Sequence, residues 1–145
     1  MNKIFKFIIL IYLTFFASMT LAKENFFDEA LKMYQNKNYE DARFMLERNI
    51  VFNPKDAKSY LYLAKIYNHE ENQNKEEYNL ETTLLIEPNN EEAILMLMKI
   101  ALKKSNYSKV KNLSETFTKV CKKLCDKNKE IQKSLKNIEP ENNES

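Results

Sequence analysis

The chain repeats itself with the spacing that separates Pro54 from Pro88. Each of these prolines follows an apolar stretch that ends in one polar residue. A period of this length, about 34 residues, is typical of folds that stack one supersecondary unit several times, because a single unit cannot bury its apolar face alone. Moving the chain along itself by one period, here called the repeat shift, aligns apolar or small residues on one helical face, namely Phe26 with Tyr60 and Ile94, Ala30 with Ala64 and Met98, and Met33 with Tyr67 and Ala101.

These positions resemble the tetratricopeptide repeat, an antiparallel helix pair with small residues where its helices cross and a proline at its end. Copies are expected at about 23–56, 57–90 and 91–124. The third departs from the pattern, because it has Lys122 in place of the proline and Met98 in place of a small residue. The resemblance implies an all-α, right-handed superhelix of about three helix pairs. The matching residues are Ala30, Tyr39, Ala42 and Pro54, then Tyr60, Leu63, Ala64, Tyr67 and Pro88, then Leu97, Ala101 and Tyr107.

Apolar periodicity gives the expected positions of the helices. The chain has no glycine, so few residues favour the tight turns of closely spaced strands. Apolar residues at helical spacing predict a last amphipathic helix over 126–138, which covers the open end of the stack. The polar segment 139–145 is expected to be disordered. Six further helices are expected near 24–36, 40–52, 57–70, 75–87, 91–104 and 107–120, with turns at Asn36–Asn38 and Asn72–Asn74.

The segment 1–22 has the layout of a secretory signal peptide. Lys3 and Lys6 precede an apolar run, and small residues follow it up to Ala22. We expect cleavage between Ala22 and Lys23, which would place the mature protein in the periplasm or elsewhere in the envelope, with secretion from the cell as an alternative. The alternative is an uncleaved membrane anchor, because 4–21 is close to the length that spans a bilayer.

Charge is distributed unevenly along the chain. Residues 23–92 contain 9 basic and 15 acidic residues, whereas 93–138 contain 12 basic and 3 acidic ones. A basic end can attract an acidic protein surface. Because export makes intracellular nucleic acid an unsuitable target, we expect a protein or peptide partner, and an acidic one is the candidate.

By the resemblance, the first helix of each pair lines a concave groove that is the family's usual ligand site. A peptide could bury apolar side chains there and pair its carboxylates with lysines. The alternative is that the apolar members of the set only cover neighbouring helices. The expected groove residues are Phe27, Leu31 and Tyr34 in the first pair, Leu61, Lys65, Asn68 and His69 in the second, and Leu95, Lys99, Leu102 and Lys103 in the third.

Cys121 and Cys125 are the only cysteines, and they lie four residues apart. In an oxidising compartment such a pair normally forms a bridge. A disulfide across this spacing needs a distorted turn, so it predicts a break in the helix near Lys122–Asp126. Free packed thiols and a redox role are the alternatives. Two cysteines and the distant His69 fall short of a structural zinc site, so no metal or other cofactor is expected.

No motif indicates catalysis. A Gly-rich phosphate loop and a nucleophile elbow both require glycine, which is absent. We therefore expect an exported scaffold that binds a peptide or partner protein in the groove and helps to assemble or maintain an envelope complex. The alternative is a membrane-anchored spacer or self-associating module, and an enzyme is a more distant possibility.

Overall fold

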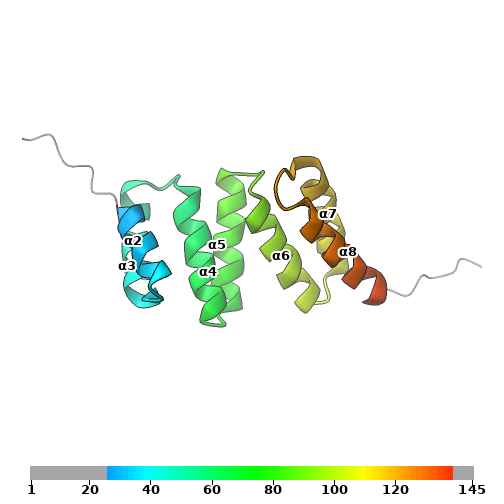
Figure 1. Cartoon of the computed structure of the whole chain (residues 1–145), viewed down its shortest axis with the longest axis horizontal. Coiled ribbons are helices and arrows are strands. Elements are labelled where there is room, and N and C mark those ends of the chain that lie inside the picture. Colours follow the sequence, from blue (N-terminus) through cyan, green and yellow to red (C-terminus); the bar gives the residue numbers. More distant parts are fainter. Residues whose placement is uncertain (1–25, 139–145) are drawn as a thin grey trace, which may run out of the picture.

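The computed structural model describes residues 26–138, which form seven α-helices and no strand (Figure 1). The all-α fold predicted from the repeat is confirmed. The expected signal segment 1–22, the membrane anchor that is its alternative, and the tail 139–145 lie outside the described residues. The helices are α2 (Phe26–Gln35), α3 (Tyr39–Phe52), α4 (Ala57–His69), α5 (Gln73–Ile86), α6 (Glu91–Lys103), α7 (Tyr107–Val120) and α8 (Cys125–Ile138).

The helices pack in sequential pairs. α2 packs on α3, α4 on α5, and α6 on α7. The second helix of each of the first two pairs also packs on the first helix of the next pair, and α8 packs on α6 and α7. The result is an elongated stack with α2 and α8 at opposite ends (Figure 1).

The turns inside the three pairs share one backbone geometry. Lys37, Glu71 and Ser105 occupy the same position in successive repeats and adopt φ angles of 61°, 56° and 54°. In each turn the next N–H donates to the carbonyl five residues earlier, as Asn38 does to Met33 at 2.9 Å. This arrangement is a Schellman motif, in which glycine is the usual residue at positive φ. The chain places a lysine, a glutamate and a serine there instead.

The second turn lies earlier than the sequence predicts. Glu70–Asn72 form it, so the expected turn at Asn72–Asn74 is wrong, and α5 begins at Gln73 rather than at residue 75. The Asn72 side chain accepts a hydrogen bond from the Lys75 backbone N–H at 3.2 Å. An asparagine at this position satisfies a backbone donor that has no partner within the helix, and it thereby fixes where the helix starts.

The core is a row of three apolar clusters along the stack. The first surrounds Ala30 and joins α2, α3 and α4. The second surrounds Leu80 and joins α4, α5 and α6. The third surrounds Phe117, and Ile131 and Leu135 of α8 are buried in it. The last helix therefore covers the apolar end of the third pair, as a repeat stack requires.

Candidate binding face

The helices divide into two layers. We define the inner face as the exposed and half-buried side chains of α2, α4, α6 and α8, and the outer face as those of α3, α5 and α7 (Figure 1). The residues predicted to bind a ligand all come from α2, α4 and α6. The structure divides them into an aromatic end, two buried leucines and a basic end.

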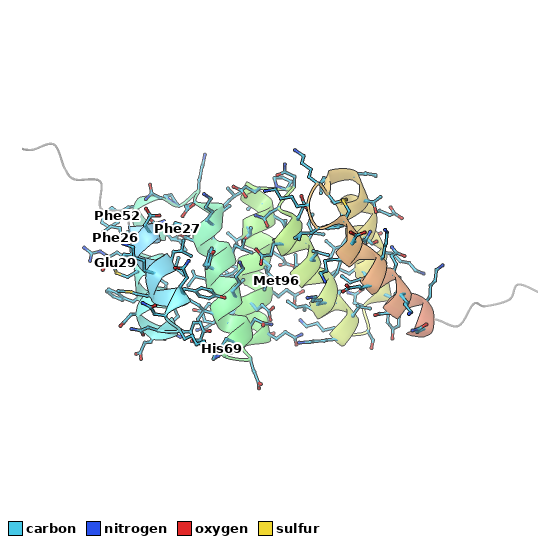
Figure 2. The ribbon with its side chains drawn as sticks, in the orientation of Figure 1. Phe26, Phe27, Glu29, Phe52, His69 and Met96 are labelled. Carbon is cyan, nitrogen blue, oxygen red and sulfur yellow. A yellow bond between two sulfur atoms is a disulfide. The ribbon has the colours of Figure 1, made fainter. Side chains whose placement is uncertain are left out.

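The aromatic end of the inner face lies between α2 and α4. Tyr62 is at its centre, with ring centroids 5.7 Å from Phe27 and 5.0 Å from Tyr34, both in edge-on contact. Tyr34 also contacts Tyr39, the first residue of α3, at 5.5 Å. The Tyr39 ring lies 4.3 Å from that of the exposed His69, which Figure 2 labels at the end of α4. Phe27 and the three tyrosines are half-buried. Because edge-on pairs fix one another's orientation, they form a preformed apolar surface that remains partly open to solvent.

The Tyr34 hydroxyl is neutral in this setting. Burial, followed by the neighbouring Tyr39 and Tyr62 hydroxyls, raises the pKa of Tyr34 above its ordinary value of 10.0. The Tyr34 hydroxyl therefore stays protonated near neutral pH. Leu31, on the same helix as Tyr34, is also half-buried and adds apolar area.

Lys65 is already engaged within the protein. Its Nζ lies 4.4 Å from the centroid of the Tyr62 ring and forms an ion pair with Glu92 at 2.9 Å. Only 18% of its side chain is exposed, so a ligand carboxylate would have to displace Glu92. Asn68 is committed in a similar way, because its Nδ2 donates to Glu76 at 2.9 Å.

Leu61 and Leu95 are buried, which corrects their place in the expected groove. Leu61 is 7% exposed and belongs to the cluster that includes Leu97 of α6. Leu95 is 6% exposed and belongs to the cluster that includes Ile131 of α8. On α4 and α6 this position packs against a neighbouring inner helix, which is the alternative given for the apolar members of the expected groove, whereas the same position is half-buried in α2 and exposed in α8.

The basic end of the inner face begins on α6. Lys99 and Lys103 are exposed, and neither forms an ion pair with another residue in the part of the chain that the structure describes. Leu102 is half-buried and packs against the cluster around Phe117. Of the three predicted lysines, Lys99 and Lys103 are therefore the two whose charges are open to a ligand.

Sequence reasoning missed Tyr62. Its counterparts under the repeat shift are Asp28 and Met96, which share neither its ring nor its polarity. The repeat therefore gives no signal at this position. Helical spacing could have indicated Tyr62, because it lies three residues before Lys65 on the same helix and side chains at that spacing are neighbours.

Sequence reasoning also treated residues 126–138 only as a covering helix, and so missed three lysines of α8. Under the repeat shift Lys99 aligns with Lys133. The same shift brings Leu95 onto Lys129 and Leu102 onto Lys136. The period itself was the signal, and it continues one helix farther than the three expected copies.

The loop between α7 and α8 contains the only cystine. The structure joins Cys121 and Cys125 in a disulfide with a Cα–Cα distance of 5.4 Å. α7 ends at Val120 and α8 begins at Cys125, so the helix breaks across the bridged segment. The bridge and the break lie together, as the spacing requires.

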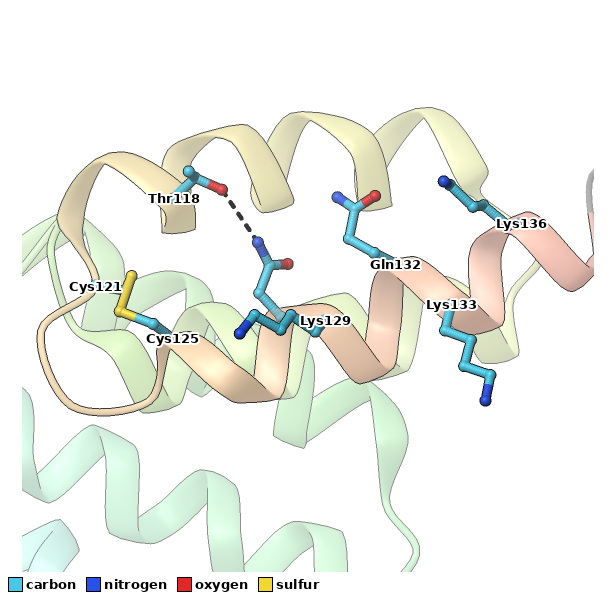
Figure 3. Close-up of a pocket in the computed structure, with 8 residues that line it drawn as sticks. Thr118, Cys121, Cys125, Lys129, Gln132, Lys133 and Lys136 are labelled. Carbon is cyan, nitrogen blue, oxygen red and sulfur yellow. Dashed lines mark hydrogen bonds between the residues drawn. A yellow bond between two sulfur atoms is a disulfide. The ribbon is translucent and has the colours of Figure 1, made fainter.

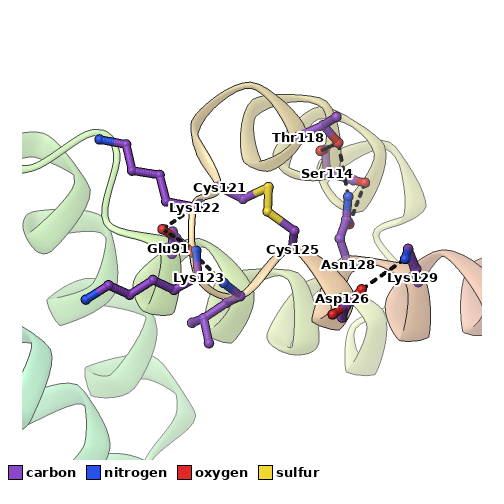
Figure 4. The surroundings of a disulfide bond; sticks show 11 residues. Glu91, Ser114, Thr118, Cys121, Lys122, Lys123, Cys125, Asp126, Asn128 and Lys129 are labelled. Carbon is purple, nitrogen blue, oxygen red and sulfur yellow. Dashed lines mark hydrogen bonds and ion pairs between the residues drawn. A yellow bond between two sulfur atoms is a disulfide. The ribbon is translucent and has the colours of Figure 1, made fainter.

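A carboxylate from α6 holds the same loop from the other side (Figure 4). Glu91 accepts hydrogen bonds from the backbone N–H groups of Lys122 at 2.9 Å, Lys123 at 3.0 Å and Leu124 at 2.7 Å. The bond from Leu124, followed by those from Lys123 and Lys122, holds the pKa of Glu91 below its ordinary value of 4.5. This residue therefore ties the start of α6 to the start of α8, a role that the sequence did not indicate.

The outer face carries exposed apolar side chains on its first two helices. Four of the five occupy two positions that recur under the repeat shift, and the same positions of α7 hold Asn112 and Lys119. The fifth, Phe52 of α3, is 64% exposed and its ring stacks on that of Phe26. Exposed rings and aliphatic chains gathered on neighbouring helices are uncommon on isolated proteins and mark contact surfaces. The four are Phe44 (62% exposed) and Val51 (77%) on α3, and Tyr78 (67%) and Leu85 (84%) on α5.

The described range 26–138 has neither a cluster of metal-ligating side chains nor a membrane-spanning helix. No three His, Cys, Asp or Glu side chains of that range lie together as metal ligands would. None of its helices combines the length and the apolar character needed to cross a bilayer.

No protein-family model matches this chain, and no curated protein matches it significantly. Solved structures do. The Yersinia enterocolitica type III secretion chaperone SycD, in complex with a peptide of the translocator YopD, has a TM-score of 0.71 and 13% identity, over 79% of this chain and 92% of that chain. The Sgt2 TPR domain from Aspergillus fumigatus has a TM-score of 0.61 and 15% identity, over 87% and 89%. MamA from Desulfovibrio magneticus RS-1 has a TM-score of 0.52 and 22% identity, over 77% and 59%. The chain therefore has the fold of the tetratricopeptide-type helical repeats.

Proposed function

We propose that this chain is an exported protein-interaction scaffold that binds a peptide or partner protein on its inner face and serves in the assembly or maintenance of an envelope complex. The observation that carries the proposal is the aromatic end around Tyr62. Its rings are ordered by one another, yet they remain only half-buried. Core packing alone does not require several rings at a solvent boundary, whereas an apolar ligand side chain gains from them.

The two ends of the inner face suit different parts of one ligand. Apolar side chains of a peptide would cover Phe27 and Tyr34, and its carboxylates would meet Lys99 and Lys103. SycD, which shares the fold, has been solved with a peptide of YopD, and this supports peptide binding as a use of such a stack. The partner of this chain is inferred from its own side chains.

The experiment is a crosslinking capture of partners by the full-length protein, compared between two surface variants. The inner-face variant carries Phe27→Ser, Lys99→Glu and Lys103→Glu. The matched outer-face variant carries Phe44→Ser and Tyr78→Ser. We expect partners to be lost from the inner-face variant alone, with both variants folded by circular dichroism. Loss from the outer-face variant alone would move the binding surface to α3 and α5.

A second candidate function, self-association, is favoured by the apolar patch on the outer face. Two copies could cover Phe44, Val51, Tyr78 and Leu85 against one another and so remove them from water. Sedimentation velocity would then find a dimer that Phe44→Ser with Tyr78→Ser converts to a monomer. The control is Asn112→Ser with Lys119→Ser, which changes the positions of α7 that correspond to the four apolar side chains. A monomer at every concentration would exclude this function.

Export and envelope location are part of the same proposal. They are supported by the composition of residues 1–22. The intact mass of the protein isolated from the exported fraction should correspond to a chain that begins at Lys23. A mass that retains Met1–Ala22, with the protein in the membrane fraction, would instead favour the membrane-anchored spacer.

A further inference from the structure

A hollow with a volume of about 580 Å³ lies between α7 and α8, beside the disulfide (Figure 3). It is separate from the aromatic end of the inner face. One side is formed by α7 and the loop, and the other by successive turns of α8. Its lining residues are Thr118, Cys121, Cys125, Asn128, Lys129, Gln132, Lys133 and Lys136.

The hollow occupies the place of a following helix. In α6 the positions of Ile94, Leu95 and Met98 are buried in the cluster that α7 and α8 complete. The repeat shift places Asn128, Lys129 and Gln132 at the corresponding positions of α8. Asn128 and Gln132 contact α7 through hydrogen bonds, and no described helix follows α8 to pack on this side of it as α7 packs on α6. The stack therefore ends with one surface shaped for a neighbour but lined with polar and basic side chains.

The polar groups nearest α7 already have partners. Asn128 donates to the Thr118 hydroxyl at 3.1 Å and accepts from the Ser114 hydroxyl at 2.8 Å. Gln132 donates to the same Ser114 hydroxyl. These groups hold α8 against α7 and need no ligand. What the hollow offers a partner is the apolar edge of the disulfide and the ammonium groups along α8.

Those ammonium groups are open. Lys133 and Lys136 form no ion pair with any described residue. Lys129 pairs with Asp126 at 2.9 Å, but the two side chains are 81% and 92% exposed, so solvent screens the pair and a ligand can replace it. Lys129, Lys133 and Lys136 are spaced i, i+4, i+7, which places them on one side of the helix over about 10 Å along its axis.

We propose that this hollow binds an acidic helical segment of a partner protein, which packs as one more helix of the stack. A partner helix with carboxylates at the same spacing can meet the three lysines when it lies along α8. Its apolar residues then cover the disulfide. This site does not rest on the proposed use of the aromatic end, and either can fail without the other.

The test uses the oxidised full-length protein and a fluorescein-labelled synthetic helical peptide with glutamates at i, i+4 and i+7 beside leucines. Fluorescence anisotropy at low salt measures its affinity. Changing Lys129, Lys133 and Lys136 to glutamine should weaken binding about tenfold. The control changes the exposed Lys32, Lys37 and Lys55 of the first helix pair and the loop after it to glutamine, which removes the same charge elsewhere and should leave the affinity within about twofold. Equal losses in both variants would overturn the site.

Two further measurements separate a shaped site from general attraction between charges. Thr118→Trp fills the hollow without changing the charge and should abolish binding, whereas unchanged binding would overturn the proposal. A peptide of the same composition interrupted by proline should bind weakly, because it cannot form the helix. If it binds as well as the helical form, the surface attracts any polyanion and the proposal is wrong.

The chain supplies one alternative occupant, because 139–145 contains Glu139, Glu141 and Glu144. A variant with these three residues changed to glutamine should bind the peptide with an affinity close to that of the natural chain. If the peptide binds to this variant but not to the natural chain, the chain's own segment 139–145 occupies the hollow and a partner helix is excluded.

Discussion

The first two helix pairs and the third pair with α8 share a backbone plan but present different surfaces. Phe44 and Tyr78 on the outer face correspond to Asn112 in the third pair, and the aromatic end around Tyr62 gives way to Lys99 and Lys103 along the inner face. The turns, by contrast, are the same in all three pairs. The turns that the stack requires recur in every pair, whereas the surface side chains differ between the two regions.

The two regions should differ most in the stability effect of a substitution at a position that is buried in α6 and exposed in α8. Leu95→Glu buries a charge in the cluster around Phe117 and should cost about 4 kcal/mol or more of the free energy of unfolding. Lys129→Glu, at the equivalent exposed position of α8, should change it by less than about 0.5 kcal/mol. Urea denaturation followed by circular dichroism measures both. Similar losses would mean that α8 does not continue the repeat.

The disulfide belongs to the second region alone. Changing Cys121 and Cys125 to serine should lower the free energy of unfolding by about 2 kcal/mol, because the bridge closes a very short loop. Hydrogen exchange should accelerate in α7 and α8 and stay unchanged in α2–α4, since a repeat stack transmits stability mainly between neighbours. Acceleration throughout the chain would contradict this division.

The two regions share the backbone geometry of their turns, with one residue at positive φ in each pair. A residue other than glycine at positive φ is strained, so Lys37→Gly, Glu71→Gly and Ser105→Gly should each stabilise the protein by about 0.5–1 kcal/mol, even after the added chain entropy. The control is Asn112→Gly, which lies inside α7 and should destabilise it by a similar amount. Thermal unfolding would show three equal gains if the turns are equivalent, and unequal gains if they are not.

The smallest expected effect is a pH dependence confined to the second region. The pKa of Glu91 is lower in the folded chain than its ordinary value of 4.5, because backbone N–H groups bind the carboxylate. Its contribution to stability is therefore present above pH 4.5 and is lost as the pH falls through the lower folded value. Glu91→Gln should flatten this part of the curve of melting temperature against pH. Identical curves for both proteins would show that the loop contacts do not form in solution.

Much of the fold could be predicted from the sequence, because packing positions recur and can be read by shifting the chain. Ala30 and Ala64 are buried where the helices cross, and the two prolines follow the second helices. The second turn was misplaced because two asparagines, Asn72 and Asn74, could each start a helix, and propensity alone does not choose between them. The hydrogen bond of Asn72 decides it in the structure.

The candidate site could be predicted only in part. The expected groove positions all lie on the first helices of the pairs, where the sequence put them, but a period cannot distinguish a leucine that packs between two helices from one that faces solvent. Leu61 and Leu95 are of the first kind, and only the packing of neighbouring helices reveals it. Pairings across long stretches of chain were equally invisible, among them Lys65 with Glu92 and Glu91 with the loop at 122–124.

The Glu91 contact has a consequence for the order in which the protein folds. A chain that is synthesised from its amino end makes Glu91 well before the N–H groups that this carboxylate binds. The first pair and α4 can pack while the rest is still being made, since their cluster uses only α2–α4, whereas the cluster around Leu80 also needs α6. Until the rest of the chain is made, the Glu91 carboxylate of the third pair remains solvated, and the apolar cluster that Ile131 and Leu135 complete remains exposed. The N–H groups of 122–124 reach Glu91 just before α8 is made, so this early carboxylate places the loop from which α8 then covers the cluster.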